Sequence, residues 1–202
     1  MKKVKIFFQG DSITDASRDR TDNHNLAGYS LKVASLLGDR FEYVNYGISG
    51  DTSRHVLLRH ENEFQKEKAD IMVMMIGIND VWRFFDGHIN DAVDEKECVS
   101  NIKKIIEITR KINPSVKIIF LEPYFIAGFI SCLNNANENF LKHLKLIQKE
   151  IPPVVDYYIP FADDFLLRSK NNELPADDGV HPNEIGQALI AERIVAAVKT
   201  IQ

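Results

Sequence analysis

Short apolar runs alternate along the chain with longer segments in which apolar residues recur every three or four positions. The longer segments predict helices over residues 29–37, 52–68, 99–112, 135–150 and 184–201. Five short runs are predicted to be strands, at residues 4–9, 41–46, 70–76, 117–121 and 154–158. This alternation is typical of an α/β protein in which helices cover both faces of a five-stranded parallel sheet.

Composition and charge narrow the class of protein. A chain of 202 residues suits a single domain over residues 1–202. Lys and Arg number 25 against 29 for Asp and Glu, and they form no basic block, so we expect no nucleic-acid partner.

No apolar run reaches the ~18 residues that span a bilayer, so we expect a cytoplasmic protein without a membrane partner. Cys98 and Cys132 lack metal-ligand spacing and are interpreted as free thiols.

The loops after the predicted strands carry the candidate chemistry. In parallel sheets flanked by helices, ligands bind beyond the carboxyl ends of the strands. The first strand ends in Gly10-Asp11-Ser12, the second leads to Gly50, and the third leads to Asn79-Asp80. A fourth segment, Asp178 to His181, lies just before the last predicted helix. We therefore expect these four segments to meet at one edge of the sheet.

Ser12, Asp178 and His181 meet the requirements of nucleophilic catalysis. A serine hydroxyl needs an imidazole to take its proton, and the imidazole needs a carboxylate to orient it. Asp178 precedes His181 by three residues in one short turn, close enough to accept a hydrogen bond from its Nδ1, and Asp177 is the second candidate for this acid. The oxyanion that forms needs donors, and we expect them from the backbone N–H groups of Ser12 and Gly50 and the side-chain amide of Asn79.

Each segment taken singly also has an ordinary structural explanation. Gly10-Asp11-Ser12 is a common turn after a strand, Asn79-Asp80 can cap a helix, and Asp177-Asp178-Gly179 can form a type I turn. The catalytic hypothesis depends on the joint occurrence of all four segments, each at the end of the sheet where a site is expected.

The same segments resemble the conserved blocks of the SGNH hydrolases, also called the GDSL esterase and lipase family. The resemblance spans the chain. It implies a flavodoxin-like three-layer α/β/α sandwich and a serine ester hydrolase with a Ser-His-Asp triad, without metal or cofactor. The matching segments are Gly10-Asp11-Ser12-Ile13-Thr14 as the nucleophile block, Gly50 as the oxyanion glycine, Gly77-Ile78-Asn79-Asp80 as the asparagine block, and Asp178 to His181 as the acid and base.

A narrower resemblance concerns the substrate. The segments Gly10 to Asp15, Gly47 to Gly50 and Gly77 to Arg83 are similar to those of intracellular carbohydrate acetylesterases, including enzymes that act on acetylated xylo-oligosaccharides. This implies a small-molecule acetyl ester as substrate and an acyl-enzyme intermediate, and the related enzymes imply a homo-oligomer. In that group a tryptophan often precedes the catalytic acid, whereas Asp177 stands there in this chain, so we expect this part of the pocket to differ.

Three residues are assigned to the surroundings of the substrate. Trp82 and Arg83 follow Asn79 and are expected to line a sugar or acyl pocket, although packing of a helix on the sheet would also explain them. Asp11 is placed with them as a substrate-side residue, and we expect it to brace the Ser12 loop by hydrogen bonds without reacting.

Other interpretations stay open. The polar stretch 17–25 suits a solvated loop or a substrate-binding loop, and the apolar stretch 125–130 suits an acyl cavity, a lid or a subunit interface. A lysophospholipase or thioesterase would use the same catalytic residues with a long apolar channel, whereas a non-catalytic flavodoxin-like binding module would not need His181. The sequence contains no Gly-x-Ser-x-Gly elbow and neither of the nucleotide-binding motifs, Gly-x-Gly-x-x-Gly or the Walker loop. His55 and His60 have no third ligand in view, so we expect no metal site.

Overall fold

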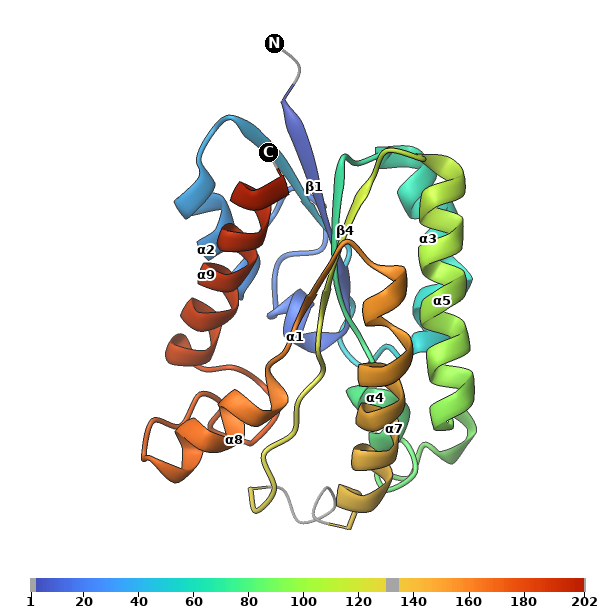
Figure 1. The fold of residues 1–202 in the computed structure, drawn as a ribbon, viewed down its shortest axis with the longest axis vertical. Helices are drawn as coiled ribbons and strands as arrows, with labels where there is room; N and C mark the ends of the chain where they lie inside the picture. Colours follow the sequence, from blue (N-terminus) through green and yellow to red (C-terminus); the bar gives the residue numbers. More distant parts are fainter. Residues whose placement is uncertain (1–2, 130–134, 202) are drawn as a thin grey trace.

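The structure is a computed structural model that describes residues 3–129 and 135–201. Cys132, and Ile130 at the end of the apolar stretch, lie outside the described residues. A parallel sheet of five strands in the order β2-β1-β3-β4-β5 forms the middle layer, and helices lie on both sides of it (Figure 1). The predicted α/β class with a five-stranded parallel sheet is confirmed. The strands are β1 (Val4–Gly10), β2 (Phe41–Asn45), β3 (Ile71–Met75), β4 (Lys117–Leu121) and β5 (Tyr157–Ile159).

The helices divide between the two faces of the sheet. On one face α2 (Gly28–Leu37) packs beside α9 (Glu184–Ile201). On the other face α5 (Glu95–Ile112) lies between α3 (Ser53–Glu67) and α7 (Asn137–Glu150). Shorter elements complete the chain, namely α1 (Ser12–Asp15), α4 (Ile78–Trp82), η1 (Ile89–Asp91), η2 (Pro152–Val154) and α8 (Ala162–Lys170).

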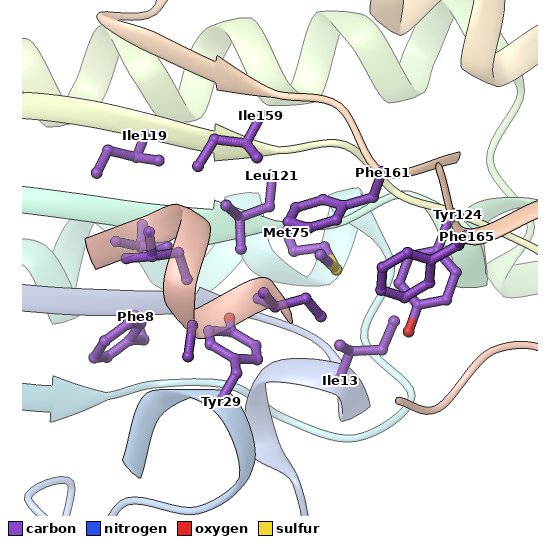
Figure 2. Packing of buried hydrophobic residues seen from close by; sticks show 14 of the residues in the cluster. Phe8, Ile13, Tyr29, Met75, Ile119, Leu121, Tyr124, Ile159, Phe161 and Phe165 are labelled. Carbon is purple, nitrogen blue, oxygen red and sulfur yellow. The ribbon is translucent and has the colours of Figure 1, made fainter. Parts of the chain in front are cut away.

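Side chains alternate between the two faces of the sheet along each buried strand, and they form one apolar core on each face. Ile6 and Phe8 of β1 face the α2 and α9 side, whereas Phe7 faces the α3 and α5 side. Figure 2 shows the first core, where the rings of Tyr124 and Phe165 lie against each other with their centroids 4.2 Å apart. Both faces of the central strands are therefore buried, which explains why β3 is apolar at every position.

Two predicted elements differ from the structure by more than two residues at their first end. The fifth strand begins at Tyr157 and not at residue 154, because residue 154 belongs to the 3-10 helix η2, which the prolines at its first two positions favour. The third predicted helix begins at Glu95 and not at residue 99, because Asp94 caps it by accepting hydrogen bonds from the backbone of Lys96 and Glu97. The polar first turn carries no apolar periodicity, so the pattern gave no sign of it.

The strand order determines where the loops open. From β1 the chain moves outward to β2 and then returns to β3 on the other side of β1. Loops on either side of such a reversal diverge at the carboxyl edge and leave a crevice there. Within the described residues, no helix combines the length and the apolar character needed to cross a membrane.

Candidate active site

Ser12 lies at the point where β1 passes into the short helix α1. Asp11 caps this helix, since its Oδ1 accepts a hydrogen bond of 3.0 Å from Ile13 N. Gly10 ends the strand with a φ of 157°, and a Cβ there would lie 2.3 Å from the carbonyl oxygen of Met75. The close contact of β1 with β3 thus requires glycine at this position, and the turn that follows holds Ser12 half-buried at the edge of the sheet.

His181 connects Ser12 to Asp178. The Nε2 atom of His181 lies 2.9 Å from Ser12 Oγ, and its Nδ1 lies 2.6 Å from Asp178 Oδ2. The other oxygen, Oδ1, accepts hydrogen bonds from the backbone of Val180 at 2.9 Å and of His181 at 2.7 Å. Burial works to raise the pKa of Asp178, but these hydrogen bonds outweigh it and hold that pKa below its usual range. Asp178 is therefore ionised at neutral pH and oriented toward the imidazole.

Asp177 does not share this role in the structure. Its side chain is exposed, and its Oδ1 accepts a hydrogen bond of 2.7 Å from Asn183 Nδ2. Of the two acids considered from the sequence, only Asp178 contacts His181.

Donor groups lie beside Ser12. The N–H groups of Ser12 and Gly50 make no hydrogen bond to any described residue. Asn79 is 3% exposed and donates one Nδ2 hydrogen to the carbonyl oxygen of Asp51 at 2.9 Å, which leaves its second hydrogen available. Gly50, Asn79 and Ser12 line the same cavity, so the three predicted donors are brought together.

Two small cavities flank the Ser12 and His181 pair. One holds about 250 Å³ and is bordered by Trp82, Arg83 and Asp86 in addition to the donor residues. The other holds about 370 Å³ and is bordered by residues in and just after α1, residues just before and at the start of α9, and Ser49; the helix-side residues are Ile13, Ala16, Ser17, Pro182 and Gln187. The Trp82 and His181 ring centroids lie 6.3 Å apart. The expectation that Trp82 and Arg83 border a pocket agrees with this arrangement, whereas their contact with substrate stays a prediction.

Arg83 is held in place by its own partners. Its Nη2 donates a 2.7 Å hydrogen bond to the carbonyl oxygen of Gly50, and its Nη1 pairs with Asp86. A Cβ on Gly50, whose φ is 88°, would lie 2.9 Å from this guanidinium. The backbone conformation favours glycine at position 50, and a Cβ there would also displace the end of the Arg83 side chain.

Asp11 departs from the prediction that grouped it with substrate-side residues. Its side chain is fully buried and borders neither cavity, so it contacts the backbone of α1 and not the contents of the site. The expected bracing role agrees with its hydrogen bond to Ile13 N. Burial raises the pKa of Asp11 to about 7, against the effect of that hydrogen bond, and the nearby carboxylates of Asp80 and Asp51 add to the rise.

This burial predicts a specific pH dependence of stability. Between about pH 4 and pH 7 the unfolded chain loses the Asp11 proton while the folded protein keeps it, so the contribution of Asp11 to the free energy of unfolding falls as pH rises. The loss amounts to about 1.4 kcal/mol for each unit of pKa difference. Asn keeps the helix cap but does not ionise, so the Asp11→Asn variant is expected to lack this loss.

Denaturant unfolding of both proteins at pH 4, 5.5, 7 and 8.5 measures the effect. Buried His60 acts in the opposite direction, because burial lowers its pKa to about 3 and its contribution to stability rises with pH. The contribution of His60 is the same in both proteins, so it cancels in the difference between their free energies of unfolding. We expect the difference to shift in favour of Asp11→Asn up to pH 7 and then to level off; a difference independent of pH would contradict the buried, protonated carboxyl.

The apolar stretch after β4 supports the turn that carries His181. Phe125 and Ile126 are buried in the core, and Ile126 N donates a 2.9 Å hydrogen bond to Gly179 O. A Cβ on Gly179, whose φ is 83°, would lie 2.5 Å from Ile126 O. Residues 127–129 are exposed, and none of residues 125–129 borders either of the two cavities, so the three roles considered from the sequence for residues 125–130 stay predictions.

The polar stretch 17–25 is held by a buried arginine. Arg18 is 8% exposed and donates hydrogen bonds to Asp22 O and Asn23 Oδ1. Of this stretch, Ser17 borders one of the two cavities beside Ser12, whereas residues 18–25 border neither of them.

Sequence reasoning missed the buried polar residues behind the site. The carboxylate of Asp80 accepts hydrogen bonds from Ser53 N at 2.9 Å and from Ser53 Oγ at 2.5 Å, and so ties the start of α4 to the start of α3. Asp51 joins Asn79 to Arg59 by its carbonyl and its carboxylate. The only sequence signal was their closeness to Gly50 and Asn79, because polar residues in loops are ordinary.

Comparisons with known proteins agree with this geometry. The model of the GDSL-like Lipase/Acylhydrolase family matches residues 8–189. An acetylxylan esterase from Geobacillus stearothermophilus is 30% identical over 96% of this chain and 93% of its own length. The crystal structure of an acetylxylan esterase from the same organism superposes with a TM-score of 0.77 at 26% identity, over 96% of this chain and 94% of that one. The human platelet-activating factor acetylhydrolase IB subunit alpha2 is 35% identical over 59% of this chain and 44% of its own length.

Proposed function

Because the chain belongs to the GDSL-like lipase/acylhydrolase family, and is therefore a carboxylic ester hydrolase, we propose that it removes short acyl groups, acetyl above all, from carbohydrate esters. Ser12 is the nucleophile of this reaction, His181 the general base and acid, and Asp178 the residue that orients His181. The observation that carries the proposal is the continuous set of contacts from Ser12 Oγ through His181 to Asp178, at 2.9 Å and 2.6 Å, between two small cavities.

Acylation begins when Ser12 Oγ attacks the ester carbonyl carbon and its proton passes to His181 Nε2. The carbonyl electron pair moves to oxygen, and this oxyanion accepts hydrogen bonds from Ser12 N–H, Gly50 N–H and the free Nδ2 hydrogen of Asn79. When the intermediate collapses, the bond to the alcohol oxygen breaks and His181 returns the proton to that oxygen. The ionised Asp178 keeps the second imidazole proton on Nδ1 throughout.

Deacylation repeats these steps with water. His181 Nε2 removes a proton from water as the water oxygen attacks the acyl-enzyme carbonyl, and the same donors stabilise the second oxyanion. Cleavage of the bond to Ser12 Oγ releases the carboxylic acid, and the proton on His181 returns to Ser12. Because His181 must be neutral to begin either half of the reaction, activity is expected to fall in acid.

The lining of the cavities supports a short acyl group and a polar alcohol. Among the described residues that border the two cavities, Ile13 is the single large aliphatic side chain, whereas serines, Arg83, Asp86 and Gln187 supply polar groups. Carbohydrates bind to sites that combine an aromatic face with hydrogen-bonding side chains, and Trp82 beside Arg83 and Asp86 offers this combination. The acetylxylan esterase relatives support the same substrate class.

A lipid-derived acetyl ester is the second candidate. The partial match to a platelet-activating factor acetylhydrolase subunit favours the acetyl group but a different alcohol. A long-chain lysophospholipase or thioesterase is less well supported, because the described residues that border these two cavities are mostly polar or small.

Relative rates on matched esters test this proposal. We expect kcat/KM for p-nitrophenyl acetate to exceed that for the butyrate by about 30-fold and that for the octanoate by more, since each of the two additional methylenes of the butyrate costs about 1 kcal/mol when it fits poorly. Acetate release from an acetylated xylo-oligosaccharide and from an acetyl glycerophospholipid, followed in parallel, identifies the alcohol. Preference for octanoate would contradict the short acyl group, and faster release from the phospholipid would contradict the carbohydrate.

A further inference from the structure

The proposed oxyanion donors come from three separate segments of the chain. Ser12 follows β1, Gly50 follows β2, and Asn79 follows β3. Donors of this kind act only if their hydrogens converge on one point, and a displacement of about 1 Å can lower the rate about 100-fold. Something must therefore fix these three segments relative to one another.

One guanidinium group reaches the segments that carry all three donors. Arg59 lies on α3, and its side chain is 18% exposed. Its Nε donates a 2.8 Å hydrogen bond to Asp51 Oδ2, next to Gly50, and its Nη2 donates a 3.3 Å hydrogen bond to Gly10 O, two residues before Ser12. The carbonyl oxygen of Asp51 in turn accepts the 2.9 Å hydrogen bond from Asn79. Arg59 and Asp51 together thus connect the loops after β1, β2 and β3.

A second set of contacts orients Arg59 itself. Its Nη1 donates a 2.6 Å hydrogen bond to Glu63 Oε2, which also accepts one of 3.0 Å from Gln9 Nε2. Gln9 Oε1 accepts a 3.1 Å hydrogen bond from Gly10 N. Gly10 is therefore held at its N–H by Gln9 and at its carbonyl by Arg59, so the strand end that presents Ser12 is fixed on both sides.

Charge explains why arginine suits this position. The carboxylates of Asp51 and Glu63 are mostly buried, and both face the guanidinium. Without it, two carboxylates would share a poorly solvated space, and the loop that carries Gly50 would have to move to relieve the repulsion. Lysine would keep the charge but could not form the planar set of hydrogen bonds to Asp51, Glu63 and Gly10 together.

We propose that Arg59, acting through Asp51 and Gly10, is a positioning residue that aligns the three oxyanion donors. Arg59 borders neither cavity, so it acts on the reaction through these residues and not by contact with substrate. The proposal rests on the esterase mechanism proposed above and adds a residue behind the site whose removal affects the transition state more than substrate binding.

Steady-state kinetics on p-nitrophenyl acetate test the proposal with Arg59→Met, Arg59→Lys and Asp51→Asn. We expect Arg59→Met to lower kcat by about 10- to 100-fold while KM changes by less than about threefold, because ground-state binding does not depend on the oxyanion donors. Arg59→Lys is expected to recover part of this loss. Asp51→Asn keeps the backbone carbonyl that holds Asn79 and is expected to lose less, about threefold to tenfold.

Arg54→Met is the matched control. Arg54 lies on the same helix and pairs with Glu97 at 2.8 Å and 3.0 Å, away from the donor segments. We expect its kcat to equal that of wild type. If Arg59→Met acted only by a general loss of stability, kcat would fall in both Arg59→Met and Arg54→Met, and each fall would follow the decrease in that variant's melting temperature. This outcome would overturn the proposal.

Replacement of the carbonyl oxygen by sulfur provides a readout specific to the oxyanion donors. Sulfur is a weak hydrogen-bond acceptor, so wild type is expected to hydrolyse p-nitrophenyl thionoacetate much more slowly than the acetate. Misaligned donors discriminate less, and the acetate-to-thionoacetate ratio should fall at least about threefold in Arg59→Met and Asp51→Asn. An unchanged ratio, or a wild-type kcat in Arg59→Met, would overturn the positioning role. Failure of the esterase proposal would instead appear as absence of hydrolysis by the wild-type protein. This result would contradict both the esterase function and the positioning role of Arg59.

Discussion

Ser12→Ala is expected to lower kcat/KM for p-nitrophenyl acetate by at least about 10⁴-fold. Loss of the hydroxyl removes the covalent step altogether, and only substrate binding and the oxyanion donors remain to assist attack by water. The fold should persist, because Ser12 is half-buried and the cap of α1 comes from Asp11 and not from Ser12. Melting temperature and circular dichroism of the variant should therefore match those of wild type.

Kinetics of single and double variants show whether Ser12 and His181 act as one catalytic unit or contribute independently to the rate. Ser12 and His181 act on one proton, so His181→Ala and the double variant should be about as impaired as Ser12→Ala. Ser49 is the control, since it borders both cavities but contacts neither His181 nor Asp178 through any described hydrogen bond. Ser49→Ala should retain activity within about tenfold. If Ser12→Ala kept most of its activity, Ser12 would not be the nucleophile.

The strands and the edge that holds the site were predictable from the sequence, because both depend on local patterns. Buried strands such as β3 are continuous apolar runs, and the carboxyl ends of parallel strands share one edge. The positions of Gly10, Gly50 and Asn79 at the ends of successive strands were therefore enough to predict that these residues lie close together. The contact between Asp178 and His181 was predictable for a similar reason, since three residues in one turn determine it.

Elements whose formation depends on distant partners were not predictable. Helix α8 begins shortly after Pro160, which follows β5, and its start is held by Glu122, whose buried carboxylate accepts hydrogen bonds from the backbone of Phe161 and Ala162. Nothing near residue 162 indicates a partner 40 residues away. Arg59 is a similar case, because on the helix pattern it is an ordinary polar position, and its contact with Gly10, 49 residues away, depends on the packing of α3 against the sheet.

Asp178→Asn is expected to lower kcat by about 10⁴-fold, although it changes the shape of the side chain very little. The reason lies in the backbone contacts of this turn. Two N–H groups, from Val180 and His181, donate to Asp178 Oδ1, so the oxygen of an asparagine must occupy that position. Its amide nitrogen must then face His181 Nδ1, where the carboxylate oxygen Oδ2 now lies at 2.6 Å.

An amide N–H facing Nδ1 requires that atom to be an acceptor, which moves the imidazole proton to Nε2. The Nε2 atom would then donate to Ser12 Oγ, across the 2.9 Å contact, and could not take its proton. Asp177→Asn is the matched control, because Asp177 lies in the same turn and contacts Asn183 instead, and it should change kcat by less than about threefold. Equal kinetics of the two variants would exclude Asp178 as the orienting acid. A large loss confined to Asp178→Asn, with KM and melting temperature nearly unchanged, would show that the turn acts by selecting the histidine tautomer.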